Sequence, residues 1–276
     1  MPSIGIRNNI ARIGSQLNLT PEVQAYISGL TTPLSSGQVG KLNKFVRTLK
    51  TGLGISALSD AFDVMYILGG ETAESSLRNL VENAHHATAV NSPAFTAFEG
   101  FTGDGTSSRI LTNYNEYLNA VNVARDNVSS GIYIRDIIKQ SQPILYGNTN
   151  IGAEHSGTAI SSHDFVFDNR NYSLCGQSYS YSYINTTGIT RVGMYSITKQ
   201  AQAARVFMNG LLIGTNNSPS VDLQNKYDNI LASGTGAYAS ATASFVYKGK
   251  HLTDNQILTV TQAIESYMDS NGKGVI

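Results

Sequence analysis

The chain has 276 residues, of which 41% are hydrophobic and 14% charged, and its 19 basic and 19 acidic residues give a formal net charge of zero. This length accommodates one large β domain with a helical extension, and the charge balance argues against a face that binds nucleic acid. No apolar stretch approaches the roughly 18 residues of a membrane-spanning helix, and the first residues lack the apolar core of a signal peptide. We therefore expect neither a nucleic-acid partner nor membrane insertion.

Residues 1–60 carry the start and stop signals of helices. Thr20 and Pro21 place a capping hydroxyl before a proline at the first helical position, which predicts a short helix. Ser35 and Gln38 have the spacing of a capping box, and an apolar stripe at helical spacing follows them. The basic residues of this second helix lie mainly on its other faces, which we interpret as solvated. The prediction is a helical N-terminal segment over 1–60, followed by a β domain over 61–276.

The next stretch mixes a buried strand with short helical turns. Residues 64–68 form an apolar run bounded by glycines, which predicts a buried strand, and 71–79 predict a short helix. His85 and His86 are adjacent, so in a strand or helix they point in different directions and make a poor chelating pair. We expect no metal site here.

From about Phe95 the pattern changes to short strands and turns. The sequence around Asp104 reads Gly-Asp-Gly, which predicts a turn, because neither the Lys-Ser/Thr of a phosphate loop nor an acidic calcium series accompanies it. Strand-like runs then recur between turn residues without a fixed period, which indicates a β-sandwich or barrel. The runs are 117–123, 131–138, 144–146, 158–160, 164–167, 178–184, 191–197, 204–208, 211–215, 227–231 and 238–247.

Asn209 and Gly210 join two of these runs. Asn-Gly favours a type I′ turn, which needs positive φ at both central residues, so a tight β-hairpin is predicted. Along the first strand, Val206 and Met208 point to one face and Phe207 to the other.

The last element is a helix with a clear start. Thr253 and Gln256 form a capping box, an apolar stripe follows, and Asn271-Gly272 ends the helix. A helix with one apolar face must pack on something. We expect it to dock on a sheet edge or on the end of the sandwich.

Three tyrosines are the candidate ligand-binding residues. Tyr179, Tyr181 and Tyr183 alternate with serines, so in a strand all three rings share one face. Exposed, they would stack on sugar rings and donate hydroxyl hydrogen bonds. Buried, they would fill one face of the sandwich. We favour the buried alternative, because sugar stacking often uses tryptophan and this chain has none.

The residues offer little for catalysis. Glycoside hydrolysis needs two carboxylates about 5–10 Å apart, and the nearest pairs are Glu71 with Glu74 and Asp164 with Asp168. No serine-nucleophile or zinc motif is present, and the single cysteine, Cys175, is interpreted as a buried apolar residue. The sequence therefore predicts no enzyme, no metal and no cofactor.

Two motifs in the closing half of the chain carry a family resemblance. An N-G-x-L-x-G hairpin is followed by a strand and then by L-[ST]-x-x-[EQ]-[IL] at the start of a helix. This order resembles laminin-G-like, concanavalin A-like jelly-roll domains over about residues 62–270. With the earlier segments DVMYILGG and FTGDGTSSRILTNY, the helical leader and jelly roll resemble structural proteins of tailed bacteriophages. The matching positions are Asn209, Gly210, Leu212, Gly214, Leu252, Thr253, Gln256 and Ile257.

The resemblance implies both a fold and a role. The fold is mainly β, a jelly-roll β-sandwich with an N-terminal helical segment and a C-terminal helix. The role is a non-enzymatic virion structural or adhesion protein of a bacteriophage, in the fibre, the decoration or the tail, with other virion subunits as partners. Amphipathic terminal helices favour a homo-oligomer. The alternative is a carbohydrate-binding module for a host surface glycan, and a glycoside hydrolase is the third hypothesis.

Overall fold

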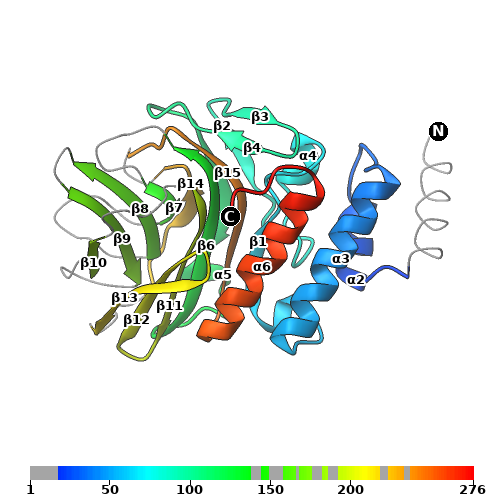
Figure 1. Cartoon of the computed structure of the whole chain (residues 1–276). Coiled ribbons are helices and arrows are strands. Elements are labelled where there is room, and N and C mark those ends of the chain that lie inside the picture. The colour runs from blue at the N-terminus through cyan, green and yellow to red at the C-terminus, as the bar shows by residue number, and fades with distance from the viewer. Residues whose placement is uncertain are drawn as a thin grey trace.

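The computed structural model describes residues 18–137, 144–148, 158–165, 168–175, 182–185, 192–217, 223–232 and 237–276. Two antiparallel sheets face each other, and a layer of helices covers the outer face of the larger sheet (Figure 1). The prediction of a mainly β sandwich with helices at both ends is confirmed.

Both sheets are antiparallel throughout the described pairings. The larger sheet has the order β13-β12-β11-β6-β15-β4-β3, with β1 also paired to β15, and the smaller has the order β10-β9-β8-β7-β14-β5-β2. The strands of the larger sheet are β13 (Leu211–Asn217), β12 (Ala203–Met208), β11 (Gly193–Gln200), β6 (Asn127–Ile137), β15 (Ala241–Gly249), β4 (Gly100–Thr102), β3 (Ala94–Thr96) and β1 (Phe62–Tyr66). Those of the smaller sheet are β10 (Ser182–Asn185), β9 (Asp168–Cys175), β8 (Thr158–Phe165), β7 (Ile144–Gly147), β14 (Tyr227–Ile230), β5 (Arg109–Asn115) and β2 (Thr88–Val90).

Strand β15 contributes to two hydrophobic cores. Val246 faces the core between the two sheets, whereas Phe245 and Tyr247 face the core between the larger sheet and the helices. Because successive side chains alternate across a strand, both faces of β15 are covered and its burial is nearly continuous.

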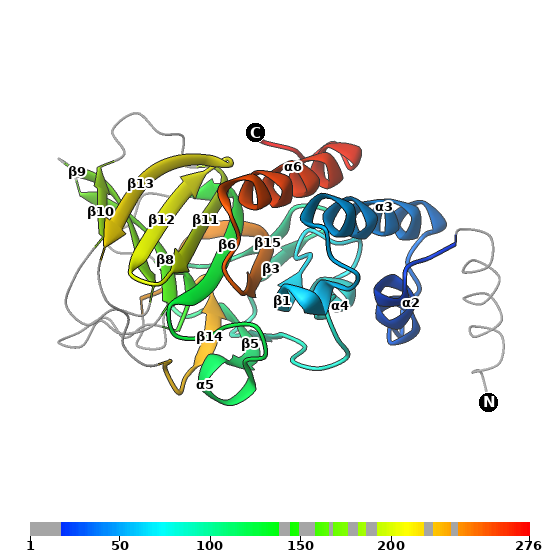
Figure 2. The same ribbon diagram turned by 90° about the horizontal axis from the view of Figure 1, so that it is seen from below.

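The helices begin where the sequence predicts. They are α2 (Pro21–Ser28), α3 (Ser36–Leu53) and α6 (Asp254–Ser270), and α3 and α6 lie side by side over the sheet (Figure 2). The capping box of α6 is complete, but Gln38 only donates its backbone N–H to Ser35. Its side-chain amide instead reaches the Asn271 Oδ1 at 2.7 Å, joining the start of α3 to the end of α6.

The docking site predicted for the C-terminal helix is wrong. The apolar side of α6 packs on the face of the larger sheet, against rings such as Phe245, rather than on an edge or an end. The reason is that this sheet is apolar on its outer side too, so it needs a cover. The apolar sides of α2 and α3 are buried in the same core, which removes the argument that they need a neighbouring subunit, and a homo-oligomer stays a prediction.

The predicted hairpin is confirmed. Asn209 and Gly210 have φ of 53° and 78°, and Met208 pairs with Leu211 across the turn. Val206 and Met208 face the core between the sheets, and Phe207 faces the helices, as alternation requires. The Asn209 side chain also accepts the Met194 N–H at 2.8 Å, which ties the turn to β11.

Four predicted elements differ from the structure. The helix expected over 71–79 is only α4 (Ala73–Ser76), and the runs 158–160 and 164–167 belong largely to one strand, β8. The strand expected over 117–123 is wrong: a short helix, α5 (Glu116–Asn119), and a loop occupy it. The reason is Asn115, whose side chain accepts the N–H groups of Tyr117 and Leu118 and so caps a helix.

Replacing Gly210 by Ala tests the hairpin. A Cβ at this position would be strained by the positive φ and would meet Leu258 Cδ1 at 2.7 Å, so we expect the free energy of unfolding to fall by about 1–2 kcal/mol. Gly40→Ala is the matched control, since a Cβ there meets nothing within 4 Å inside α3 and is expected to stabilise by up to about 1 kcal/mol. Urea denaturation of both variants measures the difference. Equal effects of the two substitutions would contradict this geometry.

Candidate functional site

An exposed apolar patch lies at one end of the smaller sheet. Eight large hydrophobic residues are exposed in the described part of the chain, and four of them belong to α5, its following loop and the start of β14. These segments lie next to one another (Figure 2). The exposed fractions of the four residues run from 49% to 86%. We call them the Tyr117–Tyr227 patch; its members are Tyr117, Leu118, Val121 and Tyr227.

Backbone pairing and one side chain hold the two halves of the patch together. Tyr227 pairs with Asn115 across β14 and β5, two residues before Tyr117. Besides capping α5, Asn115 donates its Nδ2 to the Oδ1 of Asn225 at 2.8 Å. Asn115 therefore fixes both the first turn of α5 and the residues before Tyr227.

A buried carboxylate fixes the loop that carries Val121. Asp63, on β1, accepts the backbone N–H groups of Val121, Asn122 and Val123 at 2.7–3.3 Å. It also accepts the phenolic O–H of Tyr114 at 2.7 Å. Because this carboxylate belongs to the larger sheet, the loop is anchored across the sandwich.

Directly beneath the patch lies a buried ion cluster, which we call the Lys248 cluster: Lys248, Glu116 and Asp228. The ammonium of Lys248 is 2.9 Å from the Glu116 Oε2 and 2.8 Å from the Asp228 carboxylate. The three side chains are at most 1% exposed. Lys248 comes from the larger sheet, whereas both acids belong to the side of the smaller sheet, so the cluster joins the two layers.

Further hydrogen bonds extend the cluster along the smaller sheet. The Tyr146 hydroxyl donates to the Asp228 Oδ2 at 3.2 Å, and the Gln224 N–H donates to the Glu116 Oε1 at 3.3 Å. The Thr112 hydroxyl donates to the Asp228 carbonyl at 2.9 Å. Through these contacts the cluster connects β15, α5, β14, β7 and β5.

Burial and mutual attraction act in opposite directions on these charges. Burial raises the pKa of Asp228, and the attraction of Lys248 offsets only part of that, leaving a pKa of about 6. Burial also raises the pKa of Glu116, but Lys248 outweighs it and the pKa falls below its ordinary value. For Lys248, burial lowers the pKa, while Asp228 and Glu116 outweigh burial and raise it to about 12. Lys248 and Glu116 therefore stay charged at neutral pH.

The cluster cannot reach a substrate in this structure. Glu116 and Asp228 share one ammonium and are closed to solvent, whereas a catalytic pair must flank a bound sugar. The chemical role that the geometry supports is electrostatic: three buried charges that hold strands and a helix in fixed positions.

One acid pair singled out from the sequence braces a helix connection, and the other belongs to two paired strands. Glu71 accepts the Ser35 N–H at 2.8 Å, and Glu74 accepts both the N–H and the hydroxyl of Thr31. Both therefore brace the connection between α2 and α3. Asp164 and Asp168 do not share one strand, because β8 ends at Phe165 and β9 begins at Asp168.

The predicted tyrosine stripe falls mostly outside the described residues. Tyr179 and Tyr181 are not among them, and Tyr183 lies in β10, opposite Tyr172. The direction of the three rings stays a prediction. Cys175 ends β9, opposite Thr158, and its predicted burial stays a prediction as well.

The remaining polar candidates have local roles. His85 Nδ1 lies 2.9 Å from the Asn113 carbonyl, and His86 Nδ1 accepts the Asn79 N–H at 3.2 Å, so the two rings are held separately. Asp104 accepts three backbone N–H groups of the turn that follows it, as predicted for a turn. Among the described residues, no group of three or more His, Cys, Asp or Glu has the arrangement of a metal site. In that same part of the chain, no helix is both long and apolar enough to cross a bilayer.

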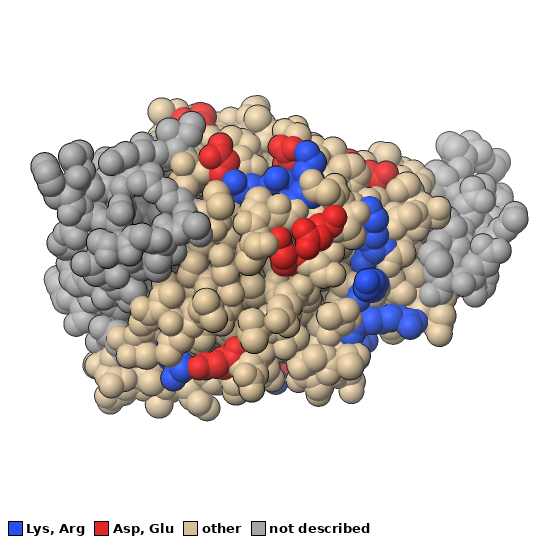
Figure 3. All heavy atoms as spheres, in the orientation of Figure 1, with Lys and Arg blue, Asp and Glu red and all other residues tan. Residues whose placement is uncertain are grey.

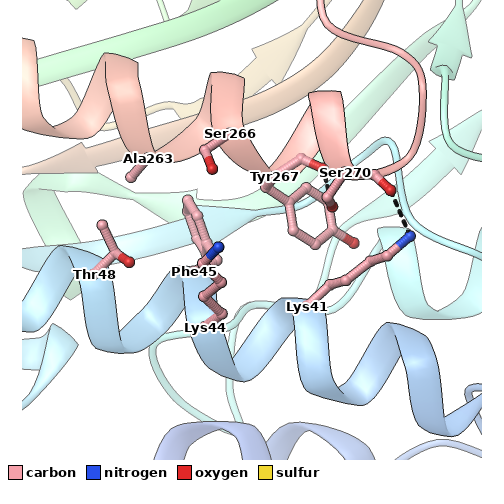
Figure 4. A pocket seen from close by; sticks show the side chains of 8 residues that line it. All are labelled: Lys41, Lys44, Phe45, Thr48, Ala263, Ser266, Tyr267 and Ser270. Atoms are coloured by element: carbon pink, nitrogen blue, oxygen red, sulfur yellow. Dashed lines mark hydrogen bonds between the residues drawn. The ribbon is translucent and has the colours of Figure 1, made fainter.

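A second surface feature lies in the seam between α3 and α6 (Figure 4). Its volume is about 40 Å³, and Lys41 spans one end by donating to the Ser270 carbonyl at 2.7 Å. A hollow of this size holds about one or two water molecules, so it is too small for a sugar ring. Figure 3 shows basic side chains along this part of the surface, with an acidic group beside them and further acidic groups elsewhere on the same face.

Sequence reasoning missed both the patch and the cluster beneath it. The apolar run 117–123 was assigned to a strand, although Asn115 before Glu116 is a helix-start signal. Lys248 sits in an apolar strand whose two faces are both buried, so alternation gave no sign of which way it points. A lysine inside such a run indicates that a buried carboxylate partner exists. It does not indicate where in the chain that partner lies.

Asp228→Asn tests the balance of charges in the cluster. The native chain binds the Asp228 proton more tightly than the unfolded chain, whose pKa is near the ordinary value of 3.8. The contribution of Asp228 to stability is therefore largest below about pH 4 and is lost as the pH rises to about 6. We expect the unfolding free energy of the wild type minus that of the variant to fall by about 2–3 kcal/mol between pH 4 and 7. Denaturant titrations across this range measure it, and a difference that grows with pH would show that Lys248 outweighs burial.

Comparison with known proteins places the fold. No family model matches the sequence, and no curated protein matches it either. Domain 4 of an extracellular arabinanase from Geobacillus stearothermophilus, solved in complex with arabinotriose, is similar with a TM-score of 0.56 and 12% identity, over 73% of this chain and 98% of that one. Trypanosoma rangeli sialidase is similar with a TM-score of 0.56 and 12% identity, over 99% of this chain.

The binding domain of botulinum neurotoxin DC, in complex with SialylT, is a third similar structure, with a TM-score of 0.55 and 13% identity over 75% of this chain. The chain spans only 40% of the length of the sialidase and 52% of that of the neurotoxin structure. At these identities the likeness is one of fold, and it agrees with the concanavalin A-like β-sandwich that the sequence motifs predict.

Proposed function

We propose that the chain is a non-enzymatic, lectin-like adhesion module that binds a glycan at the Tyr117–Tyr227 patch. The observation that carries this proposal is the exposure of two tyrosines, with Leu118 and Val121, on neighbouring segments that partly buried hydrogen bonds hold in place. Exposed aromatic and aliphatic side chains that lie together mark a binding surface. Rigid anchoring lowers the entropy lost on binding.

The chemistry of the patch suits a sugar. A tyrosine ring offers an apolar face and a hydroxyl, which match the C–H face and the hydroxyls of a pyranose or furanose. Within the described residues, the side-chain NH₂ groups of Asn119 and Asn225 have no acceptor, while their oxygens are used by Asn115. These amides are placed to donate to sugar hydroxyls beside the rings.

The structural neighbours support the same direction. Two of the three similar structures were solved with a ligand named in their descriptions, arabinotriose in the arabinanase domain and SialylT in the neurotoxin binding domain. The fold is thus one that carries saccharide ligands elsewhere, and the patch gives this chain a surface for one.

The rest of the proposal concerns context. We expect no catalysis, because the acids Glu71, Glu74, Glu116 and Asp228 are all committed to contacts within the protein. The resemblance of the sequence to tailed-phage structural proteins makes an adhesion protein of a virion the proposed setting. Its partners would then be other virion subunits, as a homo-oligomer, and a host surface glycan.

A glycan array followed by titration tests the proposal. We expect saturable binding of the wild type, weakened about tenfold by Tyr117→Ala and by Tyr227→Ala, because each removes one stacking face. Leu258→Ala is the control: this residue is also partly exposed but lies on α6, away from the patch, and binding should be unchanged.

Two results would contradict the proposal. One is the absence of saturable binding of the wild type to any glycan on the array. The other is binding that survives both patch substitutions but is lost in the triple variant Tyr179→Ala, Tyr181→Ala, Tyr183→Ala. That result would move the site to the tyrosine stripe predicted from the sequence.

A further inference from the structure

The two exposed tyrosines of the patch are chain neighbours of the two buried acids. Tyr117 follows Glu116, and Tyr227 precedes Asp228. Both acids bind the same ammonium, that of Lys248. Lys248 is therefore connected to each tyrosine of the proposed binding surface through a single acidic residue.

The local backbone geometry couples the position of each acid to the position of the neighbouring tyrosine ring. In a strand, neighbouring side chains point to opposite faces, so Asp228 directed inward leaves Tyr227 directed outward, as their burial shows. At the first turn of α5, Glu116 is buried and Tyr117 exposed in the same way. A shift of either carboxylate would carry its neighbouring tyrosine with it.

The backbone does not fix this part of β14 by itself. The pairing of β14 with β5 is irregular at this point: Tyr227 pairs with Asn115 but Asn229 pairs with Leu111, so β5 has extra residues opposite Asp228. Asn113, within that bulge, has a positive φ of 56°. Because a bulge leaves ladder positions unpaired, the Asp228 side chain adds contacts here, with Tyr146 of its own sheet and with Lys248 of the opposite sheet.

We propose that Lys248 is a positioning residue for glycan recognition: by binding Glu116 and Asp228 from the opposite sheet, it sets the separation and orientation of Tyr117 and Tyr227. This inference rests on the proposed function of the patch. Lys248 itself is fully buried and does not touch the ligand. Its effect on binding is transmitted through the Glu116–Tyr117 peptide unit and through the Tyr227–Asp228 peptide unit.

The experiment separates positioning from stability with two variants. Lys248→Met leaves two buried carboxylates without their cation, and it is expected to destabilise the fold as well. The triple variant Lys248→Met, Glu116→Gln, Asp228→Asn removes all three charges at similar volume. Because the triple variant leaves no unpaired charge in the core, which is the main cost of breaking a buried ion pair, it is expected to fold while lacking the ionic contacts of the cluster.

Two readouts are needed for each variant. The first is glycan affinity at neutral pH, which we expect to fall at least tenfold in the triple variant. The second is amide hydrogen exchange, which we expect to accelerate at least tenfold over residues 117–121 and 227–230 and to stay unchanged in β6. The control is Lys50→Met, which breaks the 2.8 Å Lys50–Glu22 ion pair between α2 and α3 in the helical layer, without touching Glu116 or Asp228, and should leave both readouts at the wild-type level.

The outcomes distinguish this inference from the proposed function. If the folded triple variant keeps wild-type affinity and wild-type exchange over both segments, Lys248 is not a positioning residue. If the wild type binds no glycan, the proposed function fails. Amide hydrogen exchange then still tests whether Lys248 positions the two segments. Unchanged protection in the triple variant would overturn this positioning role, and a loss of protection confined to residues 117–121 and 227–230 would support it.

Discussion

The structure depends on a charge buried between its two sheets. The ammonium of Lys248 leaves β15 and meets Glu116 and Asp228 on the opposite side, with all three side chains closed to solvent. Moving such ions out of water costs several kcal/mol each, and this is offset only where the partners are close and well aligned. The ion contacts of the cluster are therefore favourable in only one arrangement of the two sheets. It fixes how β15, α5 and β14 meet, and α5, its following loop and β14 carry four of the exposed large apolar side chains.

The three layers are coupled through the same strand. β15 turns Lys248 and Val246 toward the smaller sheet and Phe245 and Tyr247 toward the helices. Because both of its faces are covered, the larger sheet is the central layer of the fold. The apolar sides of the helices are buried against this sheet within the same chain. The proposed binding surface lies elsewhere, where α5 and its loop interrupt the strand pattern. The fold supplies a rigid base, and the loop-borne side chains supply the contact surface.

What the sequence predicted well depends on neighbours within a few residues. The Asn209-Gly210 hairpin, the caps Ser35 and Thr253 and most strands are local features, and the structure confirms them. The Lys248 cluster could not be predicted, because its members lie 132 and 20 residues apart in the chain. The segment 117–123 was mistaken for a strand since its β propensity is overridden by the cap from Asn115 and by Asp63 from another strand. The same long-range contacts create the patch.

The central claim is that a rigid pair of tyrosines, held from below by Lys248, recognises a glycan. The most direct measurement is an NMR titration of protein with isotope-labelled tyrosine, using the glycan that gives the strongest array signal. The account predicts saturable shifts of the Tyr117 and Tyr227 ring signals, with the buried rings of Tyr133 and Tyr247 unaffected on the far side of the larger sheet. Saturable shifts confined to other tyrosines, with the Tyr117 and Tyr227 signals unmoved, would contradict it.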